Sequence, residues 1–197
     1  MVMKMTKIKK KKETIPKTIL EEETADVVQK RAHREVFLDY GPYLVIIIVV
    51  IVIRTFIATP IRVNGASMDP TLTNGETMIL NKLVVRVRGI ERWDIVVART
   101  DGSNVIKRVI GLPGERIKYQ DGILFINGEA IEDPFSLTFT YDFEERRIGS
   151  NEYFLMGDNR SNSQDSRNPV IGNVNRRDIR GRTNIILFPF NRFGSVD

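Results

Sequence analysis

The sequence contains no cysteine, and its single histidine is His33. The absence of cysteine excludes disulfide bonds, thiolate nucleophiles and cysteine-based zinc sites. His33 precedes the long apolar run of the chain. If that run crosses a membrane, His33 lies on the opposite side from every later residue. A Ser-His-Asp triad and a histidine-built metal site are then both excluded from the part of the chain after the run.

Positive charge is in excess, with a net charge of +5. A basic balance fits either nucleic acid or an anionic membrane surface as a partner. No zinc-finger, helix-turn-helix or RNA-binding aromatic pattern accompanies the basic residues. We therefore expect a lipid bilayer and not nucleic acid, although a solvated basic tail without a specific partner is the simpler alternative. The clustered lysines are Lys4, Lys7 and Lys9 to Lys12.

Every residue from Tyr43 to Ile53 is apolar or aromatic. A helix needs about 20 residues to cross a bilayer core, which is more than this run supplies. The stretch 40–59 has that length and contains one charge, Arg54, near its outer end, where a long side chain can reach the head groups. The sequence therefore predicts a transmembrane helix at residues 40–59, with Pro60 at its exit. Because the run is rich in Ile and Val, a buried β-strand is the alternative.

Basic residues immediately before this span predict its orientation. By the positive-inside tendency, residues 1–39 stay in the cytoplasm and residues 60–197 lie outside it. No small-residue cleavage site follows the span, which favours an uncleaved anchor over a removed signal peptide. Residues 1–39 are charged and poor in aromatics, so we expect a largely disordered basic and acidic tail. The basic residues before the span are Lys30, Arg31 and Arg34.

The segment after the span is predicted to be mainly β. Short runs rich in Ile, Val and aromatic residues alternate with turns, and Asp121-Gly122 and Asn127-Gly128 are strong hairpin signals. An apolar run at 185–190 predicts a closing strand. The pattern favours an antiparallel, partly barrel-like sheet in a domain at 60–197. The other expected strands are Thr77–Leu80, Ile95–Ala98, Val105–Ile110, Arg116–Tyr119, Ile123–Ile126 and Tyr153–Met156.

Without a usable histidine, a carboxylate or a lysine must activate any nucleophilic serine. A lysine acts as a base only as its neutral amine, so it must be desolvated to work near neutral pH. Lys107 lies inside the apolar strand Val105–Ile110 and fits this requirement, whereas Lys82 is a weaker candidate. The ordinary alternative for a lysine in a strand is an edge residue that faces solvent.

Ser67 is the candidate nucleophile because it follows the predicted anchor by a few residues. Gly65 allows a tight turn before it, and Pro70 fixes the segment after it. An ordinary turn serine is the alternative. A polar stretch at 157–167 follows a predicted strand and could pair Asp165 with Arg167 internally.

These segments occur in the order of an apolar anchor, Ser-Met-Asp-Pro-Thr-Leu from position 67, Lys-Arg-Val-Ile-Gly-Leu-Pro-Gly-Glu from 107, and Gly-Asp-Asn-Arg-Ser-Asn-Ser-Gln-Asp-Ser-Arg from 157. In that order they closely resemble the bacterial type I signal peptidases, which are Ser-Lys serine proteases of the peptidase S26 family. The resemblance runs from about residue 40 to about residue 190. It implies an endopeptidase of the bacterial cell membrane that removes signal peptides from secretory preproteins at Ala-x-Ala-like sites. It implies no cofactor and no metal.

The resemblance also implies roles for individual residues. Ser67 matches the nucleophile, Lys107 the general base, and Ser163 the serine that orients the lysine amine. The remaining matches form two groups. Structural ion pairs are implied for Asp158 with Arg108 and for Asp165 with Arg167. The small substrate pocket is implied to involve Met68, Leu72 and Ile106.

Two positions depart from the pattern of the family. Some members carry a hydroxyl residue where this chain has Gly65, and that hydroxyl helps to bind the oxyanion. The backbone N–H of Ser67 then remains as one donor, with water or the glycine backbone open as the second. Trp93 stands where the family usually has glycine before Asp94, which could affect packing near the substrate groove.

Three other functions compete with this interpretation. A self-cleaving repressor protease has similar Ser-to-Lys spacing, but it predicts an internal Ala-Gly-like bond and a helical DNA-binding domain, and the sequence shows neither. A catalytically silent membrane-anchored binding module predicts a lost serine or lysine, and both are present. A nucleic-acid binder would rest on charges confined to the tail.

Overall fold

The computed structural model describes residues 38–136 and 138–196. The predicted tail at 1–39 therefore lies almost entirely outside the described residues. The chain divides into two units, residues 1–50 and 51–197. Every strand that the structure describes belongs to the second unit.

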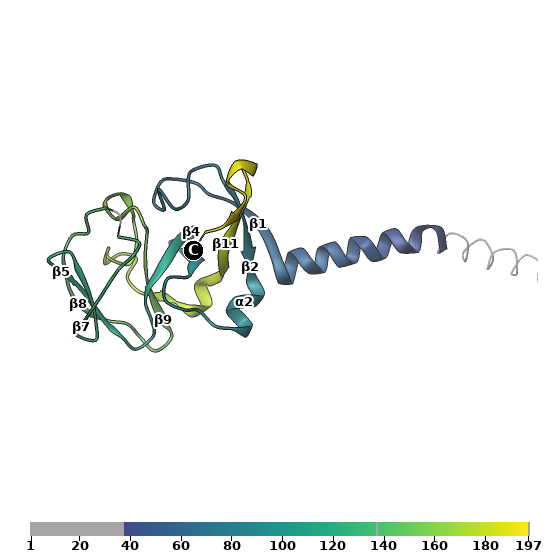
Figure 1. Ribbon diagram of the computed structural model, residues 1–197. Helices are drawn as coiled ribbons and strands as arrows, with labels where there is room; N and C mark the ends of the chain where they lie inside the picture. The colour runs from purple at the N-terminus through teal and green to yellow at the C-terminus, as the bar shows by residue number, and fades with distance from the viewer. Residues whose placement is uncertain (1–37, 137, 197) are drawn as a thin grey trace, which may run out of the picture. The chain divides into compact units, whose positions relative to one another are not determined.

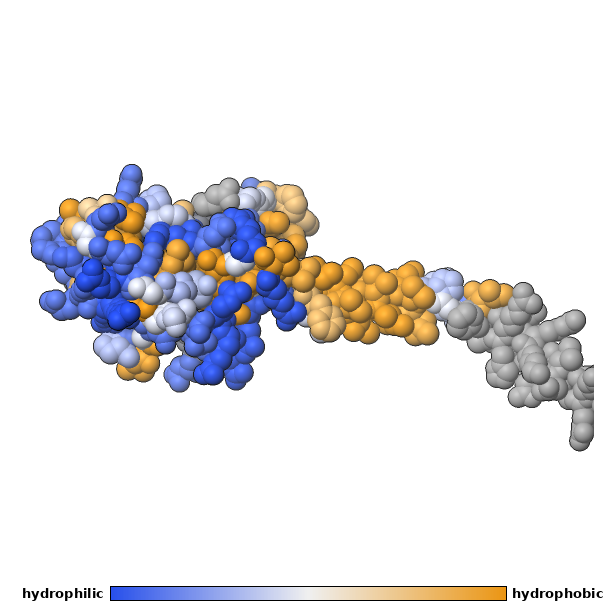
Figure 2. All heavy atoms as spheres, turned by 90° about the horizontal axis from the view of Figure 1, so that it is seen from below, coloured by the Kyte–Doolittle hydropathy of each residue, from blue (hydrophilic) through white to orange (hydrophobic). Residues whose placement is uncertain are grey.

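One helix in the described part of the chain, Leu38–Ile57, is long and apolar enough to cross a membrane. It ends two positions before the predicted end of the span at residue 59. Its side chains are exposed, and the face visible in Figure 2 is apolar along most of the helix. A lone helix with exposed Ile and Val side chains suits a lipid environment, since the helix satisfies its own backbone and lipid covers its side chains. The alternative of a buried strand is wrong.

The helix passes directly into the first strand. Its last turn is the π-turn η1 (Ile53–Ile57), and β1 (Ala58–Arg62) begins at the next residue. The Thr59 hydroxyl donates a 2.8 Å hydrogen bond to the Arg54 carbonyl, one of those that a helix end leaves without an internal partner. Pro60 therefore does not mark the exit. It lies within β1, at the edge of the sheet, where a missing N–H is tolerated.

Two antiparallel sheets build the rest of the molecule (Figure 1). The larger has the strand order β1-β2-β11-β3-β4-β9-β10, with β12 paired to β11, and the smaller has the order β7-β6-β5-β8. The bounds in the larger sheet are β2 Thr77–Asn81, β3 Ile95–Thr100, β4 Ser103–Gly111, β9 Glu152–Met156, β10 Val174–Asn175, β11 Ile179–Phe188 and β12 Gly194–Ser195. Those in the smaller are β5 Arg116–Gln120, β6 Ile123–Ile126, β7 Glu129–Ile131 and β8 Phe143–Arg147. The expectation of a mainly antiparallel β domain is confirmed.

The six shorter predicted strands are all present, and both predicted hairpins connect strands of the smaller sheet. Asp121-Gly122 joins β5 to β6 and Asn127-Gly128 joins β6 to β7, each pair with positive φ at both residues. Positive φ at both positions is the requirement of a type I′ turn, which explains why these dipeptides carried the signal.

The predicted closing strand at 185–190 is partly wrong. β11 begins at Ile179 and lies between β2 and β3, inside the sheet. Charged side chains alternate with buried ones in its first half and hid the pattern. Gly181 is buried in this half, and a side chain does not fit there because a Cβ would lie 2.6 Å from the Asn81 carbonyl oxygen.

A short helix and three 3-10 turns complete the domain. Helix α2 (Lys82–Val87) follows β2, and the Asn81 side chain caps it by accepting from the N–H groups of Leu83 and Val84. A cap of this kind starts a helix at once, without the long periodic pattern that sequence reasoning needs. The 3-10 turns are η2 Arg160–Asn162, η3 Arg176–Asp178 and η4 Phe190–Arg192.

Candidate active site

Ser67 lies on the loop between β1 and β2, and the loop is anchored to the core on both sides of it. The Val63 N–H donates to the Glu76 carbonyl at 2.8 Å, and the Gly75 N–H returns to the Val63 carbonyl at 2.9 Å. Met68, next to Ser67, is buried in one of the hydrophobic clusters. Ser67 itself is only partly buried, so a substrate can reach its hydroxyl. The other buried residues of that cluster are Val63, Leu72, Met78, Ile95 and Ile186.

Residues from the stretch 157–167 hold the nucleophile loop from the other side. The Asn159 side-chain amide donates to the Ala66 carbonyl at 3.0 Å, and its backbone N–H donates to the Ser67 carbonyl at 3.1 Å. Gly157 lies so close to the loop that a Cβ there would collide with the Ser67 carbonyl oxygen and the Ser163 hydroxyl. Glycine is thus required at 157 for space, because no side chain fits between these segments.

Lys107 reaches the same hydroxyl from the middle of the larger sheet. It lies on β4 opposite Val96 of β3, and it is 5% exposed. Its Nζ is 2.6 Å from Ser67 Oγ, within hydrogen-bonding distance. Burial lowers the pKa of the ammonium, and this effect outweighs the opposing charge of Asp165. The site therefore favours the neutral amine that a base requires. The solvent-facing alternative for Lys107 is wrong.

A buried ion pair links β4 to the stretch 157–167 one residue beyond Lys107. Arg108 Nε and Nη2 donate to the two oxygens of Asp158 at 2.8 and 2.7 Å, and both side chains are almost completely buried. Arg108 Nη1 also donates to the Trp93 carbonyl at 2.8 Å. Such bidentate pairs fix geometry as well as neutralising charge. This pair sets the position of the stretch 157–167 relative to Lys107.

A second ion pair joins two residues within the stretch 157–167. Arg167 Nε and Nη2 donate to the Asp165 oxygens at 2.8 and 2.9 Å, and the Gly157 N–H donates to Asp165 at 3.1 Å. Burial tends to raise the pKa of Asp165, but the Arg167 guanidinium and the polar groups around the carboxylate, the Gly157 N–H among them, together hold the pKa below its usual range. Asp165 therefore stays ionised and holds the Arg167 guanidinium near Lys107.

Comparisons with known proteins find relatives of this chain. A family model described as signal peptidase, peptidase S26, matches residues 37–188. The chain belongs to the signal peptidase family. Signal peptidase I of Bacillus licheniformis is 35% identical over 78% of this chain and 89% of its own length. Signal peptidase I S of Bacillus subtilis is 36% identical over 78% of this chain and 90% of its own length. A solved signal peptidase I of Enterococcus faecalis is 31% identical, with a TM-score of 0.44 over 47% of this chain and 95% of that chain.

Ser163 is the one motif residue whose predicted contact is absent among the described residues. Its Oγ is buried and makes no hydrogen bond of normal distance and angle, although its hydroxyl contributes to the lowered pKa of Asp165. It lies beside Gly157, on the side that faces the Ser67 carbonyl. A role in orienting the amine of Lys107, as in the signal peptidase family, stays a prediction.

The residues expected to form the substrate pocket lie together around the nucleophile loop. Met68 and Leu72 are fully buried in the hydrophobic cluster, and Ile106 packs against that cluster while partly exposed. Ile106 is thus the one of the three that a substrate can touch without rearrangement. The assignment of all three to the pocket stays a prediction.

The two departures from the family pattern both lie at positions with positive φ. Trp93 has φ of 74°, a conformation that glycine adopts readily and a bulky residue rarely does. Its ring packs 5.7 Å from that of Phe135, and its carbonyl accepts from Arg108. Gly65 has φ of 96° and donates its N–H to Asn74 Oδ1 at 3.0 Å. Each residue thus holds a left-handed turn that neighbouring hydrogen bonds keep in place.

Sequence reasoning missed a buried network around Arg160. Arg160 Nη1 donates to Asp133 at 2.6 Å and to the Tyr119 hydroxyl at 3.1 Å, and that hydroxyl donates to Asp133 at 2.8 Å. Arg160 Nε donates to the Gly157 carbonyl at 3.0 Å. The network ties the smaller sheet to the stretch that holds the nucleophile loop. The position of Arg160 inside the third motif was the available signal, but its partners lie in unrelated segments.

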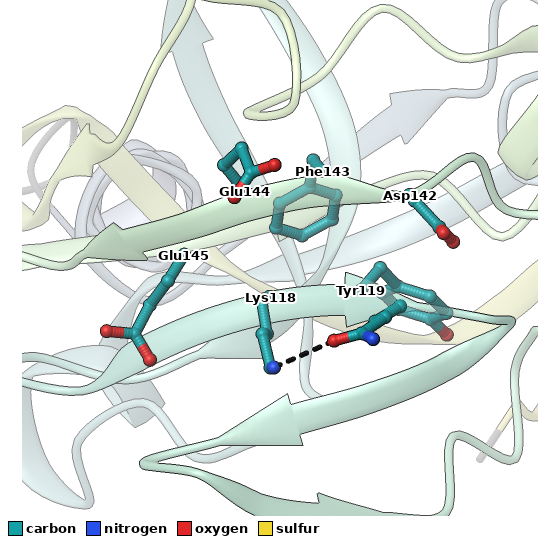
Figure 3. A pocket seen from close by; sticks show the side chains of 7 residues that line it. Lys118, Tyr119, Asp142, Phe143, Glu144 and Glu145 are labelled. Carbon is teal, nitrogen blue, oxygen red and sulfur yellow. Dashed lines mark hydrogen bonds between the residues drawn. The ribbon is translucent and has the colours of Figure 1, made fainter.

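A hollow of about 560 Å³ on the smaller sheet lies apart from this chemistry (Figure 3). Lys118 donates to Gln120 on one side of it, and acidic side chains from β8 and the residue before it stand on the other. None of the motif residues lines it, so the dyad and not this hollow locates the candidate site. The lining residues are Lys118, Tyr119, Gln120, Asp142, Phe143, Glu144 and Glu145.

Proposed function

We propose that Ser67 is the nucleophile and Lys107 the general base of this type I signal peptidase. One observation carries the assignment: the amine of a buried lysine lies 2.6 Å from the hydroxyl of a partly exposed serine. That distance lies in the range in which a base takes a proton directly. Burial supplies the lowered pKa that the same step needs.

The reaction follows from these two groups. Neutral Lys107 accepts the Ser67 proton as the oxygen attacks the scissile carbonyl, and the resulting ammonium returns that proton to the leaving amine. The peptide bond breaks and an ester to Ser67 remains. Lys107, neutral again, then takes a proton from water as water attacks the ester, and the serine is regenerated. The Ser67 N–H is one donor for the oxyanion in both steps.

The substrate is a secretory preprotein whose signal helix lies in the bilayer. Membership of the signal peptidase family and the helix Leu38–Ile57 together support an enzyme anchored to a membrane. We infer that the domain after the helix lies outside the cytoplasm, because the basic residues at 30, 31 and 34 precede it. The cleavage segment binds extended, with small residues such as Ala at P1 and P3, and enzyme and substrate meet at high local concentration because both are anchored.

The test is cleavage of a preprotein with an Ala-x-Ala site by the full chain in lipid, comparing the wild type with Lys107→Ala. Lys118→Ala is the matched control, because Lys118 also lies in a strand but its amine contacts Gln120 and the Phe125 ring and not the dyad. We expect the Lys107 variant to lose about 10³-fold in rate and the control to stay within about twofold.

Circular dichroism and thermal melting establish that each variant is folded. Ser67→Ala should be as inactive as Lys107→Ala, and the double variant no worse, because residues that act as a unit are not additive. A Lys107→Ala variant that cuts as fast as the wild type would overturn the dyad while leaving family membership intact.

A further inference from the structure

A second charged site lies on the face of the larger sheet that carries α2. A hollow of about 320 Å³ there is lined by seven residues, of which five are cationic and none is acidic. None of them belongs to the motifs of the candidate active site. The lining residues are Lys82, Val85, Arg86, Arg176, Arg177, Ile179 and Arg180.

The hollow adjoins the end of the candidate membrane helix. Lys82, the first residue of α2, donates from Nζ to the carbonyls of Arg54 and Thr55 at 3.2 and 3.1 Å. These carbonyls belong to the π-turn that ends the apolar helix, and α2 packs against that turn (Figure 1). A helix of 20 residues that spans the hydrocarbon ends where the head groups begin. The hollow therefore opens at the depth of the lipid head groups.

The floor of the hollow is fixed while its rim is free. Arg176 Nη2 donates to the Val85 carbonyl at 2.5 Å, and the side chains of Val85 and Ile179 are buried. On the rim, Arg86 and Arg180 have no acidic partner among the residues that the structure describes. Arg177 faces Asp178 at 3.9 Å with 84% of its side chain exposed, a pairing too solvated to neutralise it.

Apolar side chains flank the cations on the same short helix. Leu83 and Val87 of α2 are exposed, Val87 by 84%. An apolar contact beside a cluster of arginines matches a molecule with a phosphate head and an acyl tail, whereas a free phosphate or a polymer of phosphates has no use for it. Arginine also supplies the forked donors that phosphate oxygens accept.

We propose that this hollow binds the phosphate head group of an anionic phospholipid. The lipid phosphate bridges the rim arginines, and its acyl chains lie against the exposed side chains of α2. Such binding neutralises cations that would otherwise repel one another. It also fixes the height of the domain above the bilayer, since the site and the end of the helix share Lys82. The proposal does not depend on the assignment of Ser67 and Lys107.

Calorimetric titration of the full chain in a neutral detergent with dihexanoyl-phosphatidylglycerol tests the proposal. Dihexanoyl-phosphatidylcholine and inorganic phosphate are the comparison ligands. We expect the anionic lipid to bind at least tenfold more tightly than either, and more weakly as salt is added. Equal affinity for inorganic phosphate would assign the site to free phosphate and overturn the lipid.

The decisive variant is Arg86→Gln with Arg177→Gln and Arg180→Gln. It leaves Arg176 and Lys82 in place, so the hydrogen bonds of the floor and of the helix end remain. We expect it to bind the anionic lipid at least tenfold more weakly, since each basic residue near a membrane surface contributes about fivefold and three are removed. The matched control removes three exposed arginines elsewhere, with Arg99→Gln, Arg116→Gln and Arg147→Gln, and should bind as the wild type does. Unchanged binding by the first variant, or an equal loss in the control, would refute a site at α2.

Discussion

The two halves of the dyad are held in different ways. Lys107 lies on β4 between two neighbouring strands, and a buried ion pair at the next residue fixes the strand further. Ser67 lies on a loop whose position depends on contacts with Asn159 and on a glycine at 157. The sheet thus sets the protonation of the base by burying it, while the loop sets the alignment of the nucleophile. Changes to β4 should alter whether Lys107 can accept the Ser67 proton. Changes around the nucleophile loop should alter how often Ser67 and Lys107 come within hydrogen-bonding distance.

The largest effect is expected from Lys107→Arg, which keeps a long basic side chain but removes its ability to accept a proton. A guanidinium stays protonated at any pH at which the enzyme works, so it cannot accept the Ser67 proton. We expect a loss of about 10³-fold in kcat, similar to that of an alanine variant. Cleavage of a preprotein by folded protein measures it, with Lys118→Arg as the control. Activity within tenfold of the wild type would mean that charge and not proton transfer is the function of residue 107.

The next largest effect is expected from Gly157→Ala, which acts on the loop. The new Cβ collides with the Ser67 carbonyl and with Ser163, so the loop must shift from the position that aligns Ser67 with Lys107. A displacement of about 1 Å can lower a rate by about 10²-fold, and we expect a loss of that size in kcat. Gly111→Ala is the control, because its Cβ would collide with Ile148 in the core, away from the dyad. It should lower the melting temperature without lowering the rate per folded molecule. Equal rate losses in both would show that the contact at 157 is not specific.

The pH dependence of kcat/KM should report the pKa of Lys107, the member of the dyad that lies on β4. Burial lowers the pKa of Lys107, so the base loses activity by protonation only below that lowered pKa. The rate should fall about tenfold per pH unit on the acid limb. The midpoint of that limb should lie below the ordinary pKa of a lysine. A midpoint near the ordinary lysine pKa would contradict the burial argument.

The lowered pKa of Lys107 also makes the free energy of unfolding depend on pH. Between the lowered pKa and 10.5 the unfolded chain binds a proton at Lys107 that the folded chain does not. The contribution of this group to the free energy of unfolding therefore rises with pH across that window. Urea unfolding of the wild type and Lys107→Met at two pH values inside the window isolates it.

Much of the sheet that holds Lys107 could be predicted from the sequence. A lysine inside an apolar run has few structural roles, and the run around Lys107 forms the strand that was expected. The hairpins were equally accessible, because Asp-Gly and Asn-Gly report a backbone conformation directly. Strand β8 could not be predicted, since its charged residues Glu144 and Glu145 are exposed and conceal the alternation of a strand.

The supports of the loop could not be predicted in the same way. Arg160 and Asp133 lie in segments without periodicity, and nothing local in the sequence shows that a buried pair joins them. Gly157 looks like any glycine after a strand until the Ser67 carbonyl is seen beside it. Contacts between irregular segments depend on the whole fold. The family resemblance included Gly157 and Arg160 in a motif without a role for either, and Asp133 lies outside the motifs.

A smaller effect is expected from Asn159→Ala. The variant loses the hydrogen bond to the Ala66 carbonyl and an exposed one from the Ser161 hydroxyl, and it keeps the backbone bond to the Ser67 carbonyl. Of the two lost bonds, only the first holds the nucleophile loop. One hydrogen bond is equivalent to about a factor of ten in the population of the aligned loop, so we expect about a tenfold loss in kcat. Asn162→Ala is the control, since its side chain is exposed on the neighbouring turn. An unchanged rate for Asn159→Ala would show that the remaining contacts alone align the loop.

The smallest effect on rate is expected from Gly65→Ala, which separates the two uses of glycine around Ser67. Gly157 provides space, whereas Gly65 provides a φ of 96° and has nothing within 4 Å of the position of a Cβ. Alanine should therefore lower the free energy of unfolding by about 1–2 kcal/mol and change kcat by less than about threefold. Gly102→Ala, which also has positive φ and open space, should lose similar stability. If the rate instead falls more than tenfold, the backbone at 65 takes part in binding the oxyanion, because the strain alone is equal at the two sites.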